Sequence, residues 1–593
     1  YMAPNGLIDL LRLPSMFLRG IVINFFVLLP YIMLASVMTA WLIAGEVHPL
    51  DSFSNWLSGF GVSLGSQFIL TKTLLVLLAV LFFLFPVLNM YFQSFGQSQR
   101  PNGNWQIRNA SGRLLGWSVL AIFASAIIEL QPAIIFAYKQ FEVFGFKATD
   151  IGLAGSVGVA GAGMFTTGLL SKLSSLISRF SVYIVGVIGI LMFWIMYLHF
   201  SVMLLDATPT YQYTWVSYSG FLVISAILIC YSAFTVDANF TCVSRFYRDR
   251  LSKAFIVGYN DKREVIHTDA IKLSQLDTTL APYHLLNSTI NLSKTEEAYT
   301  AGRKGDFFMF SKRYIGSSVT GYCKTEDMEA SSRNVNLATA MSISAAAAAP
   351  NIGKNTIKIL VFILAMLNIR YDYWLPNPKK LKKRLFPKLL SGLAKAVKMD
   401  IMPSAPVRRV GPKYFLRELT GSLNADLPYV NLSDGGHIEN LGVYELVRRQ
   451  CRLIIVGDSE ADAGLTFDGL ANVMRMVQID FGVKIVMEGL DDIRLRKQHH
   501  AIGTIYYSNN KVGKIVYIKT SLLDEKNTPT KPISPQHEQH NADAVALSFD
   551  YNPYIARYKT VAPTFPHQSS GDQFFDEVQF ESYRALGYQM AWL

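Results

Sequence analysis

The sequence predicts an α/β domain combined with an all-α domain of six transmembrane helices. Of its 593 residues, 51% are hydrophobic and only 17% are charged, a composition that is apolar for a soluble protein and indicates membrane spans. The long uncharged segments all precede residue 240, and from Thr241 onward the pattern changes to short mixed strands and helices. We therefore divide the chain into a transmembrane helical domain, residues 1–240, and an α/β domain, residues 241–593.

Six segments of the first domain are predicted to cross the membrane. The first, residues 20–44, contains no charged side chain and is long enough for a hydrocarbon core of about 30 Å at about 1.5 Å per residue. Four further segments are similarly long and apolar: residues 70–90, 114–138, 181–205 and 216–234. Residues 151–170 are rich in Gly and Ala, and we count them as a span because small residues allow helices to pack closely in a membrane.

Basic residues predict the orientation of these spans. The connections at residues 91–113 and 171–180 and the segment after the last span contain Arg and Lys, whereas residues 45–69 and 206–215 contain neither. Because positively charged loops stay on the cytoplasmic side, both ends of the membrane domain and the whole α/β domain are expected to be cytoplasmic. The cysteines lie singly, without a CxxC pair, as in a reduced protein that faces the cytosol.

The net charge of +12 calls for a partner of opposite sign. No zinc-ligand spacing or interleaved basic and aromatic pattern points to nucleic acid, so anionic phospholipids are the expected partner. One segment concentrates basic residues beside Trp374 and several leucines: Lys379, Lys380, Lys382, Lys383 and Arg384. This cluster suits contact with an anionic membrane surface, and a solvated basic loop is the alternative.

Glu129 lies inside the third predicted span, next to Gln131 and Pro132. An ionisable side chain at that depth is costly and by default marks a functional site, such as a proton or headgroup contact. The alternative is a protonated or hydrogen-bonded glutamate that holds the helix bundle together. No second intramembrane charge accompanies Glu129 to form a proton relay, which favours the structural role.

The α/β domain is organised around the turn Asp434-Gly435-Gly436. A buried strand, residues 429–432, precedes the turn, and a short helix and a second apolar strand, residues 452–456, follow it. This order predicts one βαβ unit.

Asp434 is the candidate catalytic residue. In open α/β sheets, reactive groups lie just beyond the C-terminal ends of strands, and the two glycines let backbone or substrate approach closely. A carboxylate placed there can act as a general base, whereas Asp-Gly is also one of the commonest turn dipeptides. The residues alone leave both interpretations open.

The remaining pattern predicts further elements of the α/β domain. They are a strand at residues 307–310, a small-residue helix at 338–348, a buried or interfacial helix at 357–369, a helix at 468–480, a strand at 483–487, a hairpin of residues 502–507 and 514–519, and a C-terminal helix at 576–590. These segments mix helices and strands, as an α/β domain does.

Several histidines invite a metal hypothesis: His499, His500, His537, His540 and His567. None has ligand spacing with a carboxylate or a cysteine, so loop and core positions are the favoured interpretation. The sequence also has no P-loop and no dinucleotide-binding GxGxxG. Neither a metal nor a cofactor is therefore expected.

The segment SDGGHIENLG, residues 433–442, is followed by a helix and LIIVGDSEAD, and this arrangement resembles the second catalytic motif of patatin-like phospholipases. More closely, the chain resembles the bacterial patatin-like proteins that carry a block of transmembrane helices inside the hydrolase. Four further segments contribute to this resemblance: residues 245–255, 281–292, 336–353 and 565–587. Their order along the chain matches the family.

This resemblance implies a three-layer α/β/α hydrolase domain in a multi-pass protein of the bacterial inner membrane. It implies the hydrolysis of phospholipid or lysophospholipid by a Ser-Asp dyad. Asp434 would be the general base, and Gly435 and Gly436 would support the turn and the oxyanion.

The family places the nucleophile, in a GxSGG motif after a glycine-rich oxyanion loop, upstream of the position that matches Tyr1. We therefore expect this chain to be a fragment whose missing N-terminal segment supplies the serine. The nearest cytosolic match in the chain, at residues 316–320 around Ser318, lacks the last glycine of GxSxG, and we do not assign it as the nucleophile.

A function of a different class is the alternative. The chain would then be a transporter, a channel or a membrane scaffold whose patatin-like half is inert or regulatory. A homo-oligomer is compatible with either function.

Overall fold

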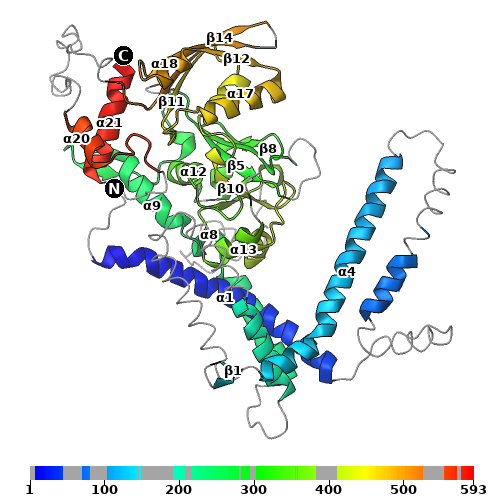
Figure 1. Cartoon of the computed structure of the whole chain (residues 1–593). Coiled ribbons are helices and arrows are strands. Elements are labelled where there is room, and N and C mark those ends of the chain that lie inside the picture. The colour runs from blue at the N-terminus through cyan, green and yellow to red at the C-terminus, as the bar shows by residue number, and fades with distance from the viewer. Residues whose placement is uncertain are drawn as a thin grey trace, which may run out of the picture. The chain divides into compact units, whose positions relative to one another are not determined.

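The structure is a computed structural model of the chain (Figure 1). It describes residues 7–44, 70–80, 84, 103–140, 142–143, 146–147, 191–206, 217–260, 262–279, 282–293, 302–332, 334–353, 356, 358–381, 410–508, 510–524, 553–569 and 576–592. These residues form two compact units, one of Phe25–Thr235 and one of Tyr1–Asn24 with Val236–Leu593. We describe each unit by itself.

Apolar helices make up the unit of Phe25–Thr235. Its described elements are α1 (Leu7–Ala44), which begins in the other unit, α4 (Gly103–Gln140), α7 (Tyr218–Thr235), two shorter helices at Leu70–Val80 and Leu191–Leu205, and the hairpin of β1 (Glu142–Val143) and β2 (Phe146–Lys147).

Three of these helices are long and apolar enough to cross a membrane: Leu18–Trp41, Gly116–Gln140 and Tyr218–Thr235. They coincide with the first, third and last predicted spans. The described parts of the spans predicted at residues 70–90 and 181–205 are the two shorter helices, and the span predicted at residues 151–170 lies outside the described residues.

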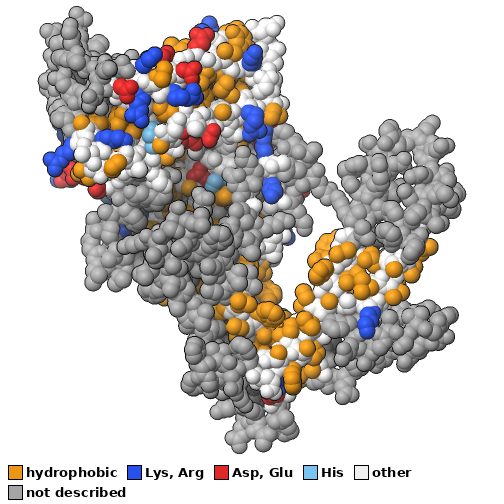
Figure 2. All heavy atoms as spheres, in the orientation of Figure 1, with side chains coloured by type: hydrophobic (Ala, Val, Ile, Leu, Met, Phe, Trp, Pro, Cys, Tyr) orange, Lys and Arg blue, Asp and Glu red, His pale blue; other side chains and the backbone are white. Residues whose placement is uncertain are grey.

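Large hydrophobic side chains cover the outer surface of α4, as Figure 2 shows in orange. Trp117, Phe123 and Phe136 are each about two-thirds exposed, at 68%, 66% and 67%. So much apolar surface on one helix is costly in water and stable in lipid. The unit is therefore suited to a membrane, in agreement with the apolar composition of its sequence.

The unit that carries the C-terminal half contains both helices and strands. Its main helices are α8 (Ala238–Thr241), α9 (Ser244–Phe255), α11 (Thr325–Ser331), α12 (Leu337–Ser344), α13 (Lys358–Met366), α15 (Pro412–Leu419), α16 (Val443–Arg448), α17 (Asp468–Phe481), α18 (Leu490–Arg494), α20 (Pro553–Val561) and α21 (Glu577–Trp592). Short 3-10 turns are η1 (Leu273–Gln275), η3 (Pro378–Lys380) and η4 (Gly435–His437).

A six-stranded sheet with the order β8-β7-β6-β5-β10-β9 forms the centre of this unit. Its strands are β5 (Leu285–Asn291), β6 (Gly305–Ser311), β7 (Tyr314–Ser317), β8 (Gly321–Lys324), β9 (Tyr373–Pro376) and β10 (Tyr429–Asp434). All neighbouring strands are antiparallel. Helix α12 packs against β5, β10 and α9, so it lies beside the strand that ends at Asp434.

A second sheet has four strands in the order β11-β14-β13-β12, and β3 (Val257–Tyr259) and β4 (Val265–His267) form a separate hairpin. The four strands are β11 (Leu453–Asp458), β12 (Lys484–Glu488), β13 (His500–Tyr506) and β14 (Val512–Lys519). Only the pair β11–β14 is parallel. The predicted strand at 483–487, the hairpin and the helix at 468–480 are confirmed by β12, β13, β14 and α17.

The predicted βαβ unit is wrong, because β10 and β11 belong to different sheets. Strand β10 is buried along its length except at Asp434, whereas β11 alternates between exposed and buried residues. Leu453 and Ile455 are 58% and 65% exposed, so one face of the second sheet is uncovered there. Both strands are apolar in sequence, and apolarity alone does not select the pairing partner.

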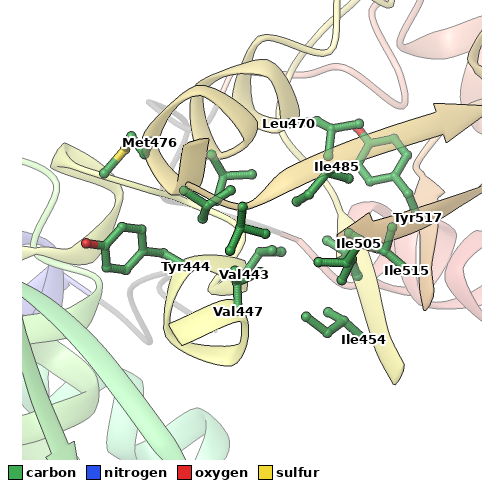
Figure 3. Packing of buried hydrophobic residues seen from close by; sticks show 14 of the residues in the cluster. Val443, Tyr444, Val447, Ile454, Leu470, Met476, Ile485, Ile505, Ile515 and Tyr517 are labelled. Carbon is green, nitrogen blue, oxygen red and sulfur yellow. The ribbon is translucent and has the colours of Figure 1, made fainter. Parts of the chain in front are cut away.

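The main core of the second sheet lies between its strands, α16 and α17. Figure 3 shows these side chains gathered in one cluster, with Leu470 of α17 near Ile485 and Tyr517 and Met476 of α17 on the side of Tyr444. The cluster also includes Phe307 from β6, whose ring stacks on Tyr444 with centroids 4.1 Å apart. This contact joins the two sheets within one folded unit.

Substitution of Ile505 by Ala is expected to lower the free energy of unfolding by about 2–5 kcal/mol, because it leaves a cavity in a closely packed core. The matched control is Ile502→Ala on the same strand, since Ile502 is 49% exposed and Ile505 is fully buried. The control should change stability by less than about 1 kcal/mol. Denaturant titration of the detergent-solubilised protein measures both values, and equal losses would contradict this packing.

Candidate functional site

Asp434 is the last residue of β10 and lies where the chain leaves the central sheet. It pairs with Ser288 of β5, so the strand holds its backbone up to the turn. The carboxylate Oδ1 accepts a hydrogen bond of 2.6 Å from the amide of Gly436 and thereby caps the 3-10 turn η4. Among the described residues, this is the one hydrogen bond that reaches the carboxylate.

A side chain at either of the two positions after Asp434 would collide with neighbouring atoms. A Cβ atom on residue 435 would lie 2.7 Å from the carbonyl oxygen of Asn287, and one on residue 436 would lie 2.0 Å from Oδ1 of Asn440. Backbone oxygen cannot move aside without displacing β5, which makes the constraint at Gly435 the stricter one. The glycines therefore let the turn lie directly against β5 and keep the Asp434 carboxylate in place.

Burial raises the pKa of Asp434 to about 6, and its hydrogen bond from Gly436 opposes part of this rise. A carboxyl group with such a pKa is mostly ionised at neutral pH and accepts a proton more readily than an ordinary aspartate. Burial and the nearby charge of Asp434 raise the pKa of Tyr247, on α9, to about 12. Tyr247 is therefore neutral, and its hydroxyl donates to the carbonyl of Ala345 at 2.9 Å.

His437 lies three residues after Asp434, and the sequence analysis gave it no role. Its Nδ1 is 2.9 Å from Oγ of Ser433, and its Nε2 is 3.1 Å from the carbonyl oxygen of Ala347. A carbonyl can only accept, so Nε2 carries the proton and Nδ1 accepts from the Ser433 hydroxyl. Burial also lowers the pKa of His437. Both ring nitrogens are engaged, and the lone pair of the neutral imidazole points at Ser433.

A chain of buried amides continues from Ser433 away from the turn. Asn291 donates through Nδ2 to Ser433 Oγ at 3.1 Å and to Asn431 Oδ1 at 2.7 Å. Asn431 in turn donates to Asp372 at 2.5 Å. These hydrogen bonds fix the side-chain rotamers of Asn291, Asn431 and Ser433 near the Asp434 turn.

The alanine-rich helix ends earlier than predicted, at Ser344 instead of residue 348. The carbonyls after it accept hydrogen bonds from outside the helix: Ala345 from Tyr247 (2.9 Å), Ala347 from His437 (3.1 Å) and Ala348 from the amide of Tyr371 (2.9 Å). A continuing helix would use carbonyls internally. The early end of α12 therefore leaves main-chain acceptors free to hold Tyr247 and His437 beside Asp434.

The structure places Ser318 away from Asp434. It follows β7, and its hydroxyl donates to the carboxylate of Asp306. Ser344, at the end of α12, donates to the carbonyl of Asn287 at 2.7 Å. Among the described residues, no serine hydroxyl is hydrogen-bonded to Asp434, and no group of three His, Cys, Asp or Glu side chains is arranged to hold a metal. His537 and His540 lie outside the described residues.

The basic cluster is described only in part. Lys379 and Lys380 form the turn η3 and contact Asp426, whereas Lys382, Lys383 and Arg384 lie outside the described residues.

Trp374, which the sequence analysis placed beside this cluster, is 1% exposed and packs on Tyr414 in the interior. The expected surface position of Trp374 is therefore wrong, because its indole belongs to strand β9 and to a core cluster.

Glu129 caps another helix. Its carboxylate accepts from the amides of Leu70 and Thr71 at 2.5 and 3.0 Å and from the Thr71 hydroxyl at 2.6 Å. The two amides belong to the first residues of the helix Leu70–Val80, where free amides and the helix dipole attract a negative charge. This geometry corresponds to the structural alternative for Glu129.

Comparison of the sequence with family models, with curated proteins and with solved structures finds no match. The resemblance to patatin-like proteins therefore stays a prediction from the motifs themselves.

Replacement of Asp434 by Asn is expected to stabilise the protein at neutral pH. Because the folded pKa of about 6 lies above the ordinary value of 3.8, ionisation of Asp434 costs no stability below pH 4 and lowers the stability of the wild type as the pH rises to 6. The gain of the variant should be roughly 1–3 kcal/mol above pH 6 and vanish below about pH 4.

Denaturant titrations across this pH range measure the effect. The matched control is Asp426→Asn, since the Asp426 side chain is 82% exposed. A gain at neutral pH in the control, or none in the variant, would contradict the assigned burial of Asp434.

Truncation of Glu129 to Ala should lower thermal stability, because it removes three hydrogen bonds at the start of a helix. The expected loss is about 1–3 kcal/mol. Glu129→Gln keeps one acceptor oxygen and should lose less. Thermal unfolding in detergent measures the order, and an Ala variant as stable as the wild type would argue against this cap.

Proposed function

We propose that this chain carries the general base of a membrane-bound lipid acyl hydrolase of the patatin type, with Asp434 in that role. The observation that supports it most is the Asp434 carboxylate itself. It stands at a strand end with a raised pKa of about 6 and one hydrogen bond, in a turn that only glycines allow. A carboxylate that served only to form a turn would not need this burial.

The state of His437 supports a dyad without histidine. Its Nε2 proton is held by a main-chain carbonyl and its Nδ1 accepts from Ser433, so the lone pair of the imidazole is directed at Ser433 and not at a nucleophile from outside this chain. The neighbouring carboxylate of Asp434 has an oxygen, Oδ2, that accepts no hydrogen bond from a described residue. The catalytic proton is therefore assigned to the carboxylate.

In the proposed reaction, a serine from outside this chain attacks the ester carbonyl of a lipid. The serine proton passes to Asp434 as the Oγ–carbon bond forms, and Asp434 returns it to the departing alcohol. Water then attacks the acyl-enzyme, with Asp434 again accepting and returning a proton. The reaction needs no metal or cofactor.

A cavity of about 510 Å³ supports a lipid substrate. Its lining includes Leu276, Leu285, Leu446 and Asn287, whose carbonyl oxygen is the one that the Gly435 turn approaches. An acyl chain in this cavity would lie beside the turn that holds Asp434. Three helices of the same chain are long and apolar enough to cross a membrane, which supports a lipid substrate. We also propose that the unit with the two larger sheets faces the cytoplasm of a bacterial cell.

Hydrolysis should depend on Asp434 and on its ionisation. In the intact protein, Asp434→Asn is expected to lower kcat/KM for fatty acid release from lysophospholipid by at least about 100-fold. In the wild type, kcat/KM should fall about tenfold per pH unit below pH 6, since the protonated carboxyl cannot accept the serine proton.

Two controls sharpen this test. Asp426→Asn should keep full activity, and His437→Gln should retain the inflection near pH 6 even where its rate is lower. Labelling with a fluorophosphonate reports the serine separately. Full activity in Asp434→Asn, or loss of the inflection in His437→Gln, would overturn the assignment of the base.

A further inference from the structure

A second, polar cavity of about 270 Å³ lies between the start of α9 and α12. The residues that line it are mostly polar: Asn239, Phe240, Ser244, Arg245, Arg248, Asp269, Asn334, Asn336, Thr339, Ser342, Ile343, Tyr371 and Tyr373. The two cavities share no lining residue.

One positive charge in this cavity is uncompensated. Arg248 forms ion pairs with Asp249 at 2.8 Å and Asp269 at 3.7 Å, and its Nε donates to Thr339 at 3.2 Å. The guanidinium of Arg245 lies over the ring of Phe240, 5.1 Å from its centroid, and forms no ion pair with any described residue. The cavity therefore attracts an anion.

The start of α9 adds to this attraction. The helix begins at Ser244, no side chain caps it at Val243, and its first turn contains no acidic residue. A helix N-terminus carries a partial positive charge and favours anions, so Arg245 in its first turn repels the dipole unless an anion lies beside it. Ser244 and Arg245 both line the cavity, so the helix end and the guanidinium face the same space.

We propose that this cavity binds a phosphate group. Phosphate has several oxygens that can accept at the same time from a guanidinium fork, a second guanidinium and helix amides, which a carboxylate with two oxygens does less well. Asn239 and Arg245 lie four and ten residues after Thr235, the end of a helix apolar enough to cross a membrane. The headgroup of an anionic phospholipid is therefore one source of the phosphate, and free inorganic phosphate is the other.

The test uses the full chain in detergent and measures the shift in melting temperature with added ligand. The probes are inorganic phosphate against chloride at equal ionic strength, and dioctanoyl phosphatidylglycerol against dioctanoylglycerol, which lacks the phosphate. Arg245→Gln should weaken the apparent Kd about tenfold, the loss expected for one charged hydrogen-bond donor. Its melting temperature without ligand should change little, because Arg245 forms no ion pair with any described residue and its contact with the Phe240 ring is an exposed one.

The matched control is Arg250→Gln. Arg250 lies on the same helix and its guanidinium is 5.0 Å from the ring centroid of Phe246, but it does not line the cavity. Arg250→Gln should bind as the wild type does, and Arg245→Lys should recover part of the affinity. Asp434→Asn should also bind normally, so the result is independent of hydrolysis.

A shift with both phosphate and phosphatidylglycerol supports a site for the phosphate group itself, and a shift with phosphatidylglycerol alone supports a lipid headgroup site. The proposal is overturned if neither probe shifts the melting temperature. It is also overturned if dioctanoylglycerol acts as strongly as phosphatidylglycerol, or if Arg250→Gln weakens binding as much as Arg245→Gln.

Discussion

The buried ion pair between Arg370 and Glu418 is the constraint on which the interior of the unit that carries the C-terminal half depends. Two hydrogen bonds of 2.6 and 2.8 Å join the guanidinium to the carboxylate. The side chain of Arg370 is 1% exposed and that of Glu418 is 0% exposed. Trp374 donates to the same carboxylate at 3.3 Å, and Arg370 lies over the ring of Phe415. A charge at such depth is tolerated only with its partner, so the segment before β9 and helix α15 must assemble together.

This pair also affects the pKa of Asp372, a carboxyl group that is hydrogen-bonded to the strand that ends at Asp434. Burial, with the charge of Glu418, raises the pKa of Asp372 to about 7, and Asn431 donates to its carboxylate. Along β10, Val430 and Leu432 pack into the hydrophobic core, while Asn431 and Ser433 join the polar chain. One strand thus combines stability on one face with orientation of the site on the other.

Local elements could be predicted from the sequence better than their partners could. The helix at α17 and the hairpin of β13 and β14 follow from periodicity and turn residues, which are local properties. The pairing of β10 and β11 depends on long-range burial, so two similar apolar strands were wrongly placed in one unit. At the site, the strand end at Asp434 could be predicted from the sequence. The state of His437 could not, because it depends on the carbonyl of Ala347, which follows the end of α12 and is 90 residues away in sequence.

The early end of α12 has a chemical consequence for the site. A peptide carbonyl has no proton to give, so contact with Ala347 selects the Nε2–H tautomer of His437 whatever side chain stands at position 347. In the proposed reaction, the role of proton acceptor then falls to the Asp434 carboxylate because main-chain geometry fixes the protonation of the imidazole. The tautomer of His437 therefore does not depend on side-chain chemistry in the alanine segment. It depends on the residue at which α12 ends.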